Sequence, residues 1–368
     1  MTNKYDKCVT DKGAAVRKIL LLLAAASGML APAAQSREND ARPFVPVFTK
    51  NFPDPFILPH GGGFLAYATN ADGGRANVQM ARSTNLVDWA LIEDGGKLHD
   101  AMPVLPTWAR GGFTWAPEVM QVGGRWLLYF SARERRSDLQ CVGVAVASSP
   151  MGPFASTAPE PLVCQRAEGG TIDASPFRDT DGKLHLVHKS DGNNPRVLKP
   201  SRILVQSLAP DGLSVTSGPI ALIQNSEHWE WRVVESPTIV PTPGGGYTLF
   251  FSANHFGWEA DQRLSNYAVG YAQCASLAGP CVKARENPIL HSYNTRTEGC
   301  LSGPGHQTVF NVGKRQLVAF HAWAATRGCT RRQYVREMYV APLLWKGKTP
   351  KIGVSMRAAQ RPPDLPAR

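Results

Sequence analysis

The sequence predicts an all-β fold, a single five-bladed β-propeller, and three observations lead to this prediction. The 34 glycines and 29 prolines are spread along the 368-residue chain, as a fold with many turns requires. Helical periodicity over ten or more residues is missing after residue 34. A motif with a period near sixty residues recurs five times, and each copy is too small to bury its own sheet face. A β-sandwich, the alternative, gives no reason for this period.

Residues 1–34 differ from the rest of the chain. Arg17 and Lys18 precede the apolar run ILLLLAAASGML, and small residues follow it. This pattern predicts a secretory signal peptide cleaved near Ala33 or Ala34, with a buried core helix as the alternative. The run is too short to span a bilayer comfortably. We therefore expect a secreted or periplasmic protein without membrane association in its mature form, and a propeller domain over 35–368 with its core at about 44–350.

The five repeats share one pattern: a start that contains proline, an apolar strand, a glycine-rich turn, an aromatic-rich strand and a third strand. They begin with DPFILPHGGGFLAYATN (54–70), APEVMQVGGRWLLYFSAR (116–133), DASPFRDTDGKLHLVHKSDG (173–192), ESPTIVPTPGGGYTLFFSAN (235–254) and GPGHQTVFNVGKRQLVAFHAW (303–323). Each repeat is expected to form one blade.

The cysteines fit an oxidising compartment. Cys8 leaves with the signal peptide and six remain, an even number that favours disulfides, although the sequence alone permits 15 connectivities. Proximity in the sequence suggests Cys141 with Cys164, Cys274 with Cys281 and Cys300 with Cys329. No Cys/His spacing indicates zinc.

The net charge of +11 falls to +8 when the five basic and two acidic residues of the leader are removed. The densest basic cluster, RERR at 133–136, is interrupted by Glu134. Such a surface can bind nucleic acid or acidic polysaccharide, but scattered surface arginines are the commoner case. We expect no nucleic-acid partner, and a monomer.

Three repeats begin with an acid close to a proline: Asp54, Asp173 and Glu235, at intervals of 119 and 62 residues. The first strand of each propeller blade lines the central channel, so these carboxylates are expected to converge. Singly, each has a structural explanation, because Asp54 before Pro55 is a good turn former and the other two could cap a strand or pair with Arg232. Glu118 follows its proline and is interpreted as structural.

Converging carboxylates suit glycosidic bond hydrolysis. One carboxylic acid protonates the leaving oxygen while a carboxylate activates water or attacks carbon. A third carboxylate can tune the other two, since like charges disfavour ionisation.

The motifs DPF, WAPEV, SPMGPF, IDASPFRDTDGK, VESPTIV, GPGHQTVF and FHAW, in this order, resemble glycoside hydrolase family 43 over about residues 44–350. That family comprises arabinanases, arabinofuranosidases and β-xylosidases with a five-bladed propeller. The resemblance implies an inverting hydrolase in which Asp54 is the general base, Asp173 orients and tunes the pair, and Glu235 is the general acid. Inversion implies roughly 6.5 to 9.5 Å between the base and acid carboxyls.

The resemblance also assigns residues around the acids. His306 matches a histidine that coordinates calcium or another ion, partly through water, in several relatives; the chemistry itself requires no cofactor. A hydrogen-bonded core histidine is the alternative. Trp115 matches an aromatic residue that shapes the sugar pocket, or is a core tryptophan. Arg336 matches loosely an arginine that contacts the sugar, or is solvent-exposed.

These features predict an exported hydrolase acting on α-L-arabinofuranosyl linkages in plant cell-wall arabinan or arabinoxylan. The alternatives are a β-xylosidase, another propeller furanosidase, or a sugar-binding propeller without catalysis. Pro53 stands before Asp54 where many arabinanases carry histidine, which weakens an endo-arabinanase assignment. Ser236 stands where glycine or alanine is usual. The sequence does not encode the sugar, the linkage or the mode of attack.

Overall fold

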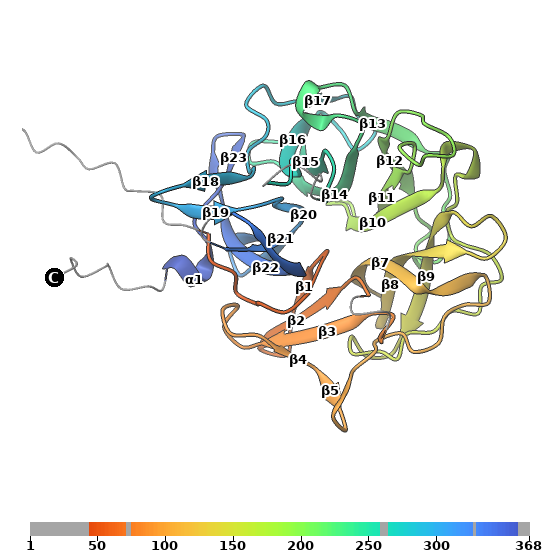
Figure 1. Cartoon of the computed structure of the whole chain (residues 1–368). Helices are drawn as coiled ribbons and strands as arrows, with labels where there is room; N and C mark the ends of the chain where they lie inside the picture. Colours follow the sequence, from red (N-terminus) through yellow and green to blue (C-terminus); the bar gives the residue numbers. More distant parts are fainter. Residues whose placement is uncertain (1–43, 71–74, 258–263, 327–328, 360–368) are drawn as a thin grey trace, which may run out of the picture. The chain divides into compact units, whose positions relative to one another are not determined.

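The structure, a computed structural model, describes residues 44–70, 75–257, 264–326 and 329–359. The signal peptide predicted for residues 1–34 lies outside them. The described residues all belong to one compact unit. Within it, five antiparallel sheets surround a common centre, which confirms the five-bladed propeller (Figure 1). None of the helices in the described part is long and apolar enough to cross a membrane.

Each blade is one meander of sequential strands. Blade one contains β1 (Phe56–His60), β2 (Gly63–Ala68), β3 (Gln79–Ser83) and β4 (Ala90–Leu91). Blade two contains β7 (Ala109–Val122), β8 (Arg125–Glu134) and β9 (Gln140–Ala147). Blade three contains β10 (Thr171–Arg178), β11 (Leu184–Ser190), β12 (Arg202–Ser207) and β13 (Ile220–Gln224).

The last two blades follow the same order. Blade four contains β14 (Val234–Pro241), β15 (Tyr247–Ala253), β16 (Ala268–Cys274) and β17 (Cys281–Lys283). Blade five contains β20 (Gly305–Val312), β21 (Arg315–Ala325), β22 (Arg331–Lys346) and β23 (Thr349–Ile352). Outside the blades lie the hairpins β5 (Glu93–Asp94) with β6 (Lys97–Leu98) and β18 (Tyr293–Thr295) with β19 (Gly299–Leu301), the 3-10 turns Arg166–Glu168 and His228–Glu230, and helix α1 (Met356–Ala359).

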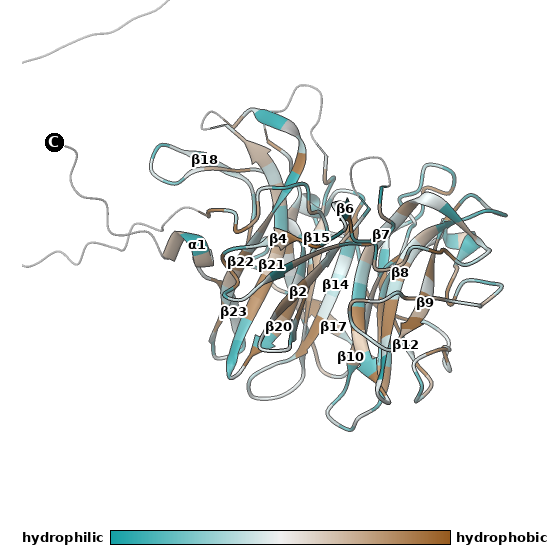
Figure 2. Ribbon diagram, turned by 90° about the horizontal axis from the view of Figure 1, so that it is seen from below, coloured by the Kyte–Doolittle hydropathy of each residue, from teal (hydrophilic) through white to brown (hydrophobic). Residues whose placement is uncertain are grey.

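The apolar core is divided among the interfaces between blades. Figure 2 shows hydrophobic residues along the strands, with hydrophilic residues both on the strands and in the turns. One cluster joins blades one and two through Tyr67 and Phe130, and another joins blades five and one through Phe52 and Met338. Three further clusters fill the remaining interfaces. Each blade is therefore stabilised by burying both faces against its neighbours.

The segment before blade one closes the ring by pairing with blade five. The amides of Val47 and Phe48 donate to the carbonyl of Met338, and the amide of Phe52 donates to the carbonyl of Arg336, at 2.9 to 3.2 Å. Asn51 Oδ1 accepts the amide of Arg336 at 2.9 Å. The first residues of the domain are thus held to β22, the third strand of the last blade.

Each blade carries one residue in the left-handed region, within the inner strand in blades two to five and two residues before β1 in blade one. These five residues are Asp54, Ala116, Asp173, Ser236 and His306, with φ between 47° and 57°. In blades two to five the residue lies where the register with the second strand shifts, as in a β-bulge. The sequence interpretation that made Glu235 equivalent to Asp54 and Asp173 is wrong by one residue, because the equivalent position is Ser236.

The amide of each bulge residue is bonded to a side chain of the preceding blade. Four amides use an acceptor at one equivalent position, which lies in the second strand or, for Thr69, directly after it. The pairs are Ala116 N to Thr69 Oγ1 (2.9 Å), Asp173 N to Ser131 Oγ (3.1 Å), His306 N to Ser252 Oγ (2.8 Å) and Asp54 N to His321 Nδ1 (3.1 Å). In blade three this position is Lys189, which pairs with Ile172 in the strand register. The amide of Ser236 is bonded instead to Asp173 Oδ2 at 2.9 Å.

All three disulfides suggested by sequence proximity are present. They join Cys141 to Cys164, Cys274 to Cys281 and Cys300 to Cys329. Each is local in the sequence, so each fastens a blade or its adjoining loop rather than two distant blades.

Ring closure gives the first testable prediction. Phe52 is fully buried between blades five and one and packs edge-on against Phe48, so Phe52→Ala should destabilise the domain by about 3–5 kcal/mol. Urea unfolding measures the difference. Leu344→Ala, in a side chain that is 51% exposed on β22, serves as the control and should cost less than about 1 kcal/mol. Equal losses in both variants would contradict the importance of this interface.

Candidate active site

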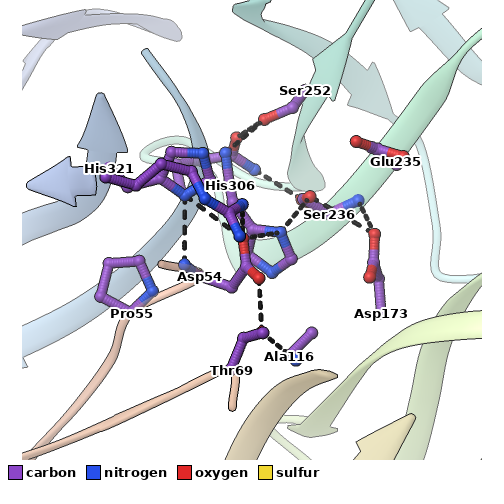
Figure 3. Close-up of polar contacts among 12 residues, drawn as sticks. Asp54, Pro55, Thr69, Ala116, Asp173, Glu235, Ser236, Ser252, His306 and His321 are labelled. Carbon is purple, nitrogen blue, oxygen red and sulfur yellow. Dashed lines mark hydrogen bonds and ion pairs between the residues drawn. The ribbon is translucent and has the colours of Figure 1, made fainter. Parts of the chain in front are cut away.

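One cavity of about 140 Å³ collects all six residues singled out by the sequence: Asp54, Trp115, Asp173, Glu235, His306 and Arg336. The rest of its lining comprises Thr69, Ile172, Phe256, Tyr267 and His321. It lies where the bulges of the five inner strands converge, as Figure 3 shows for Asp54, Asp173, Ser236 and His306. The three acids thus converge after folding, as the sequence predicted. Their chemical roles stay predictions.

Asp54 is surrounded by donors and cations. Thr69 Oγ1 donates to Oδ2 at 2.5 Å, and Arg336 donates to Oδ1 at 3.1 Å. The ring nitrogen Nδ1 of His306 lies 3.2 Å from the same Oδ1. Burial alone would raise the pKa of Asp54, but Arg336 and His306 outweigh it and hold that pKa well below the ordinary value of 3.8. Asp54 is therefore ionised at neutral pH.

Ring closure explains the position of Arg336. Its backbone is bonded to Asn51 and Phe52, so its side chain is held beside Asp54 from the opposite end of the chain. The guanidinium also lies 5.4 Å from the ring centre of Phe256. Trp115, which precedes the positive-φ residue Ala116 in β7, is half-buried and lines the cavity.

Glu235 is held through both carboxylate oxygens. Lys189 Nζ donates to Oε2 at 2.8 Å, and the hydroxyl of Tyr267 donates to Oε1 at 2.7 Å. Burial raises the pKa of Glu235, but the ammonium of Lys189 lowers it further, so the net shift is downward from 4.5. Lys189 is fully buried, and its pKa is raised by its carboxylate neighbours despite the cost of burial. The ammonium is therefore charged.

Asp173 has the opposite shift. Its Oδ2 accepts the amide of Ser236 at 2.9 Å. Burial, with a smaller contribution from the charge of Glu235, raises the pKa of Asp173 to about 6. The two carboxyls are thus electrostatically linked, so the first proton to enter the pair favours Asp173. The cavity therefore holds one carboxyl that is kept ionised, Asp54, and two carboxyls, Asp173 and Glu235, whose protonation is linked.

The protein atoms around His306 offer few oxygen ligands to a calcium ion. Its Nδ1 is 2.8 Å from Ser236 Oγ and 3.2 Å from Asp54 Oδ1, and calcium prefers six to eight oxygen ligands. Among the described residues, the one group of three or more clustered ligand atoms is Glu134 with Cys141 and Cys164, whose sulfurs form a disulfide. The protein atoms near His306 do not make a calcium cage. A calcium ion here would depend mainly on water, and its presence stays a prediction.

Four polar residues of the site were missed by the sequence interpretation: Thr69, Lys189, Tyr267 and His321. Lys189 and His321 occupy the second-strand position equivalent to Thr69, so aligning the repeats at ATN, FSA, HKS, FSA and FHA could have found both. Tyr267 precedes β16 in a connection between strands, and no repeat marks it. Burial lowers the pKa of His321 to about 4, so this ring is neutral when it accepts the amide of Asp54.

Glu118 is buried but does not line the cavity. It lies two residues beyond the bulge of blade two. Burial raises the pKa of Glu118 to about 8, with a smaller contribution from the charge of Asp173. The side chain is therefore mostly protonated at neutral pH, and its structural interpretation stays a prediction.

The model of the family described as glycosyl hydrolases family 43 matches residues 44–350. Among curated proteins, extracellular endo-α-(1→5)-L-arabinanase 2 of Bacillus subtilis (strain 168) is 22% identical over 361 residues, covering 81% of this chain and 72% of that protein. A putative β-xylosidase of Xylanibacter ruminicola is 25% identical over 201 residues, covering 50% of this chain and 36% of that protein. The chain thus matches about a third of the xylosidase's length.

A solved structure, that of a thermostable family-43 glycoside hydrolase, superposes with a TM-score of 0.70 at 26% identity. The superposition covers 87% of this chain and 97% of that structure. The similarity therefore extends over the whole propeller rather than over a few blades.

The buried Glu118 generates a prediction for stability. The folded protein keeps this proton up to about pH 8, whereas the unfolded chain releases it near pH 4.5, so the free energy of unfolding falls as pH rises between these values. Glu118→Gln imitates the protonated form, so its free energy of unfolding should match that of the wild type near pH 4.5. Near pH 8 it should be more stable by roughly 3 kcal/mol or more. Urea unfolding at both pH values tests this, and a difference independent of pH would contradict it.

Proposed function

The chain belongs to glycosyl hydrolases family 43 and is a glycoside hydrolase, and from this premise we propose that it cleaves α-L-arabinofuranosyl linkages in plant cell-wall arabinan or arabinoxylan. The choice of arabinose is supported by the relative with the wider coverage, the Bacillus subtilis arabinanase, which aligns with 81% of this chain. The aligned part of the xylosidase is shorter, at 50%.

The mechanism we propose is a single displacement with inversion. The carboxylate of Asp54 removes a proton from water, the water oxygen bonds to the anomeric carbon, and the glycosidic C–O bond breaks. Glu235 gives its proton to the departing sugar oxygen. The observation that supports these roles is that the three carboxyls line one cavity, where Arg336 keeps Asp54 ionised and the charge of Glu235 acts on Asp173.

The other lining residues take supporting roles in this proposal. Asp173 orients the acid through the amide of Ser236 and adds negative charge that favours protonation of Glu235. Trp115 offers an apolar face to the sugar ring, and Arg336 donates to its hydroxyls. The cavity of about 140 Å³ is smaller than pockets for drug-sized ligands, which favours one sugar unit at the acids.

We also propose that the protein is exported through its N-terminal leader and acts as a monomer on its polysaccharide. Three disulfides fit an oxidising compartment, and the Bacillus subtilis relative is named extracellular. A water-held calcium near His306 would add positive charge beside Asp54, and no step above depends on it.

Substrate screening tests the sugar and the stereochemistry. With 4-nitrophenyl α-L-arabinofuranoside and 4-nitrophenyl β-D-xyloside, kcat/KM should be at least about tenfold higher for the arabinofuranoside, since a specific pocket discriminates by this much or more. Debranched arabinan reports action on the polymer. Proton NMR during hydrolysis should show the inverted anomer first. Higher activity on the xyloside would favour a β-xylosidase, and the retained anomer would exclude single displacement.

The acid and base roles predict different responses to the leaving group. Glu235→Gln should lower kcat/KM by roughly 10²–10⁴-fold for an alkyl arabinofuranoside, but far less for the 2,4-dinitrophenyl glycoside, whose leaving group needs no proton. Asp54→Asn should lower kcat/KM by a similar factor for both substrates, because the attacking water needs its base whichever group leaves. Glu93→Gln, in an exposed carboxylate of β5, is the matched control and should leave both rates unchanged. Equal losses on both substrates for Glu235→Gln would remove its role as acid.

A further inference from the structure

Lys189 is the exception in the ring of contacts that joins the blades. At the four equivalent positions, Thr69, Ser131, Ser252 and His321 accept the bulge amide of the following blade. An ammonium group carries three donors and no acceptor, so Lys189 cannot make this contact. The bulge amide of blade four turns to Asp173 instead. The departure from the pattern lies between the blades that carry Asp173 and Glu235.

The freed side chain of Lys189 reaches across to blade four. Its Nζ lies 2.8 Å from Glu235 Oε2 and 3.2 Å from Asp191 Oδ1, and the residue is 1% exposed. Lys189 does not line the cavity, whereas Glu235 does. The ammonium therefore contacts the carboxylate from behind and cannot meet a sugar bound in front of it.

We propose that Lys189 is the positioning residue of the acid: its buried ammonium holds Oε2 of Glu235, directs the acidic proton to Oε1 and sets the pH range in which that proton is held. This inference deepens the function proposed above and rests on it. Because Lys189 only donates, Oε2 keeps its acceptor role and the proton of Glu235 resides on Oε1. Oε1 faces Tyr267, whose hydroxyl also lies 3.3 Å from Ser236 Oγ and can turn to that oxygen when Oε1 is protonated.

The charges around Glu235 come from four neighbouring elements. They are Lys189 of β11 and Asp191 just after it, Asp173 of β10, His306 of β20, and Tyr267 before β16. Lys189 makes the largest contribution that lowers the pKa of Glu235, and it bonds the carboxylate directly. An opposite charge at this distance shifts a carboxyl by roughly 1–3 pH units. Asp191 in turn draws part of the ammonium's charge away from Glu235.

Two substitutions should therefore move the pKa of Glu235 in opposite directions. Lys189→Met removes the cation at nearly constant length, so the pKa should rise by roughly 1–3 units. Asp191→Asn leaves Glu235 as the ammonium's main partner, so the pKa should fall. The side chain of Asp191 is 15% exposed, so its replacement tests the inference even where Lys189→Met fails to fold. Lys199→Met, which removes a surface lysine paired with Glu168 at 2.8 Å, is the matched control and should leave the pKa of Glu235 unchanged.

The first measurement does not depend on activity. Carbon-13 NMR of protein labelled at the glutamate side-chain carboxyl, with the Glu235 signal identified by its loss in Glu235→Gln, gives the pKa in each variant. A Glu235 pKa unchanged in Asp191→Asn and in folded Lys189→Met overturns the inference. The substrate screen described above tests the proposed function separately. An inactive wild type would contradict the proposed function, whereas a titration without pKa shifts would contradict the role of Lys189.

The second measurement is the pH profile of kcat/KM on the alkyl arabinofuranoside. With Lys189→Met the basic limb should move to higher pH, because the acid keeps its proton longer, and kcat should fall about tenfold or more while KM changes little. The 2,4-dinitrophenyl glycoside should be affected less. If Lys189 were merely structural, Lys189→Met would lower kcat/KM by the same factor for both substrates and would leave the basic limb of the pH profile in place. That result would refute the positioning role.

Discussion

Five backbone amides at the centre of the propeller require partners, because a buried amide without a hydrogen bond costs about 1–3 kcal/mol. Each belongs to a residue with positive φ, a conformation that L-residues rarely adopt, and four of the five lie at β-bulges. Four of them find the partner on the second strand of the preceding blade. The bulges thus link adjacent blades in sequence around the ring, and the last link, from His321 to Asp54, joins the last blade to the first.

The same constraint brings the carboxylates together. The positive φ turns each of these residues out of the regular alternation of a strand, so Asp54, Asp173 and His306 point to the common centre from three different blades. Ring closure adds the cation, because the segment that fastens blade one to β22 also holds the backbone of Arg336 beside Asp54. The charge state of Asp54 therefore depends on contacts between opposite ends of the domain.

In blade three the hydrogen bond from the next blade's backbone amide is missing at the equivalent position, and an ion pair between Lys189 and Glu235 is present instead. With lysine at the acceptor position, the amide of Ser236 is bonded to Asp173, and the ammonium pairs with Glu235. A buried ion pair of this kind contributes little net stability, since desolvation offsets the attraction. Its value here is the asymmetry it creates, with Asp173 raised in pKa and Glu235 lowered although both are buried carboxyls in one cavity.

The sequence by itself determined the repeat and the five blades and suggested the local disulfides, because strand alternation, turn glycines and short cysteine separations are properties of neighbouring residues. It also indicated that Asp54, Asp173 and Glu235 would converge, since residues at the start of an inner strand face the centre. It misjudged the alignment of Glu235 by one residue, because the bulge that makes Ser236 equivalent to Asp173 exists only in the paired sheet. The contacts of Lys189, Tyr267 and Arg336 with the acids were decided by tertiary structure alone. They join residues 32 to 282 positions apart, and such distances follow from blade packing and ring closure rather than from any local pattern.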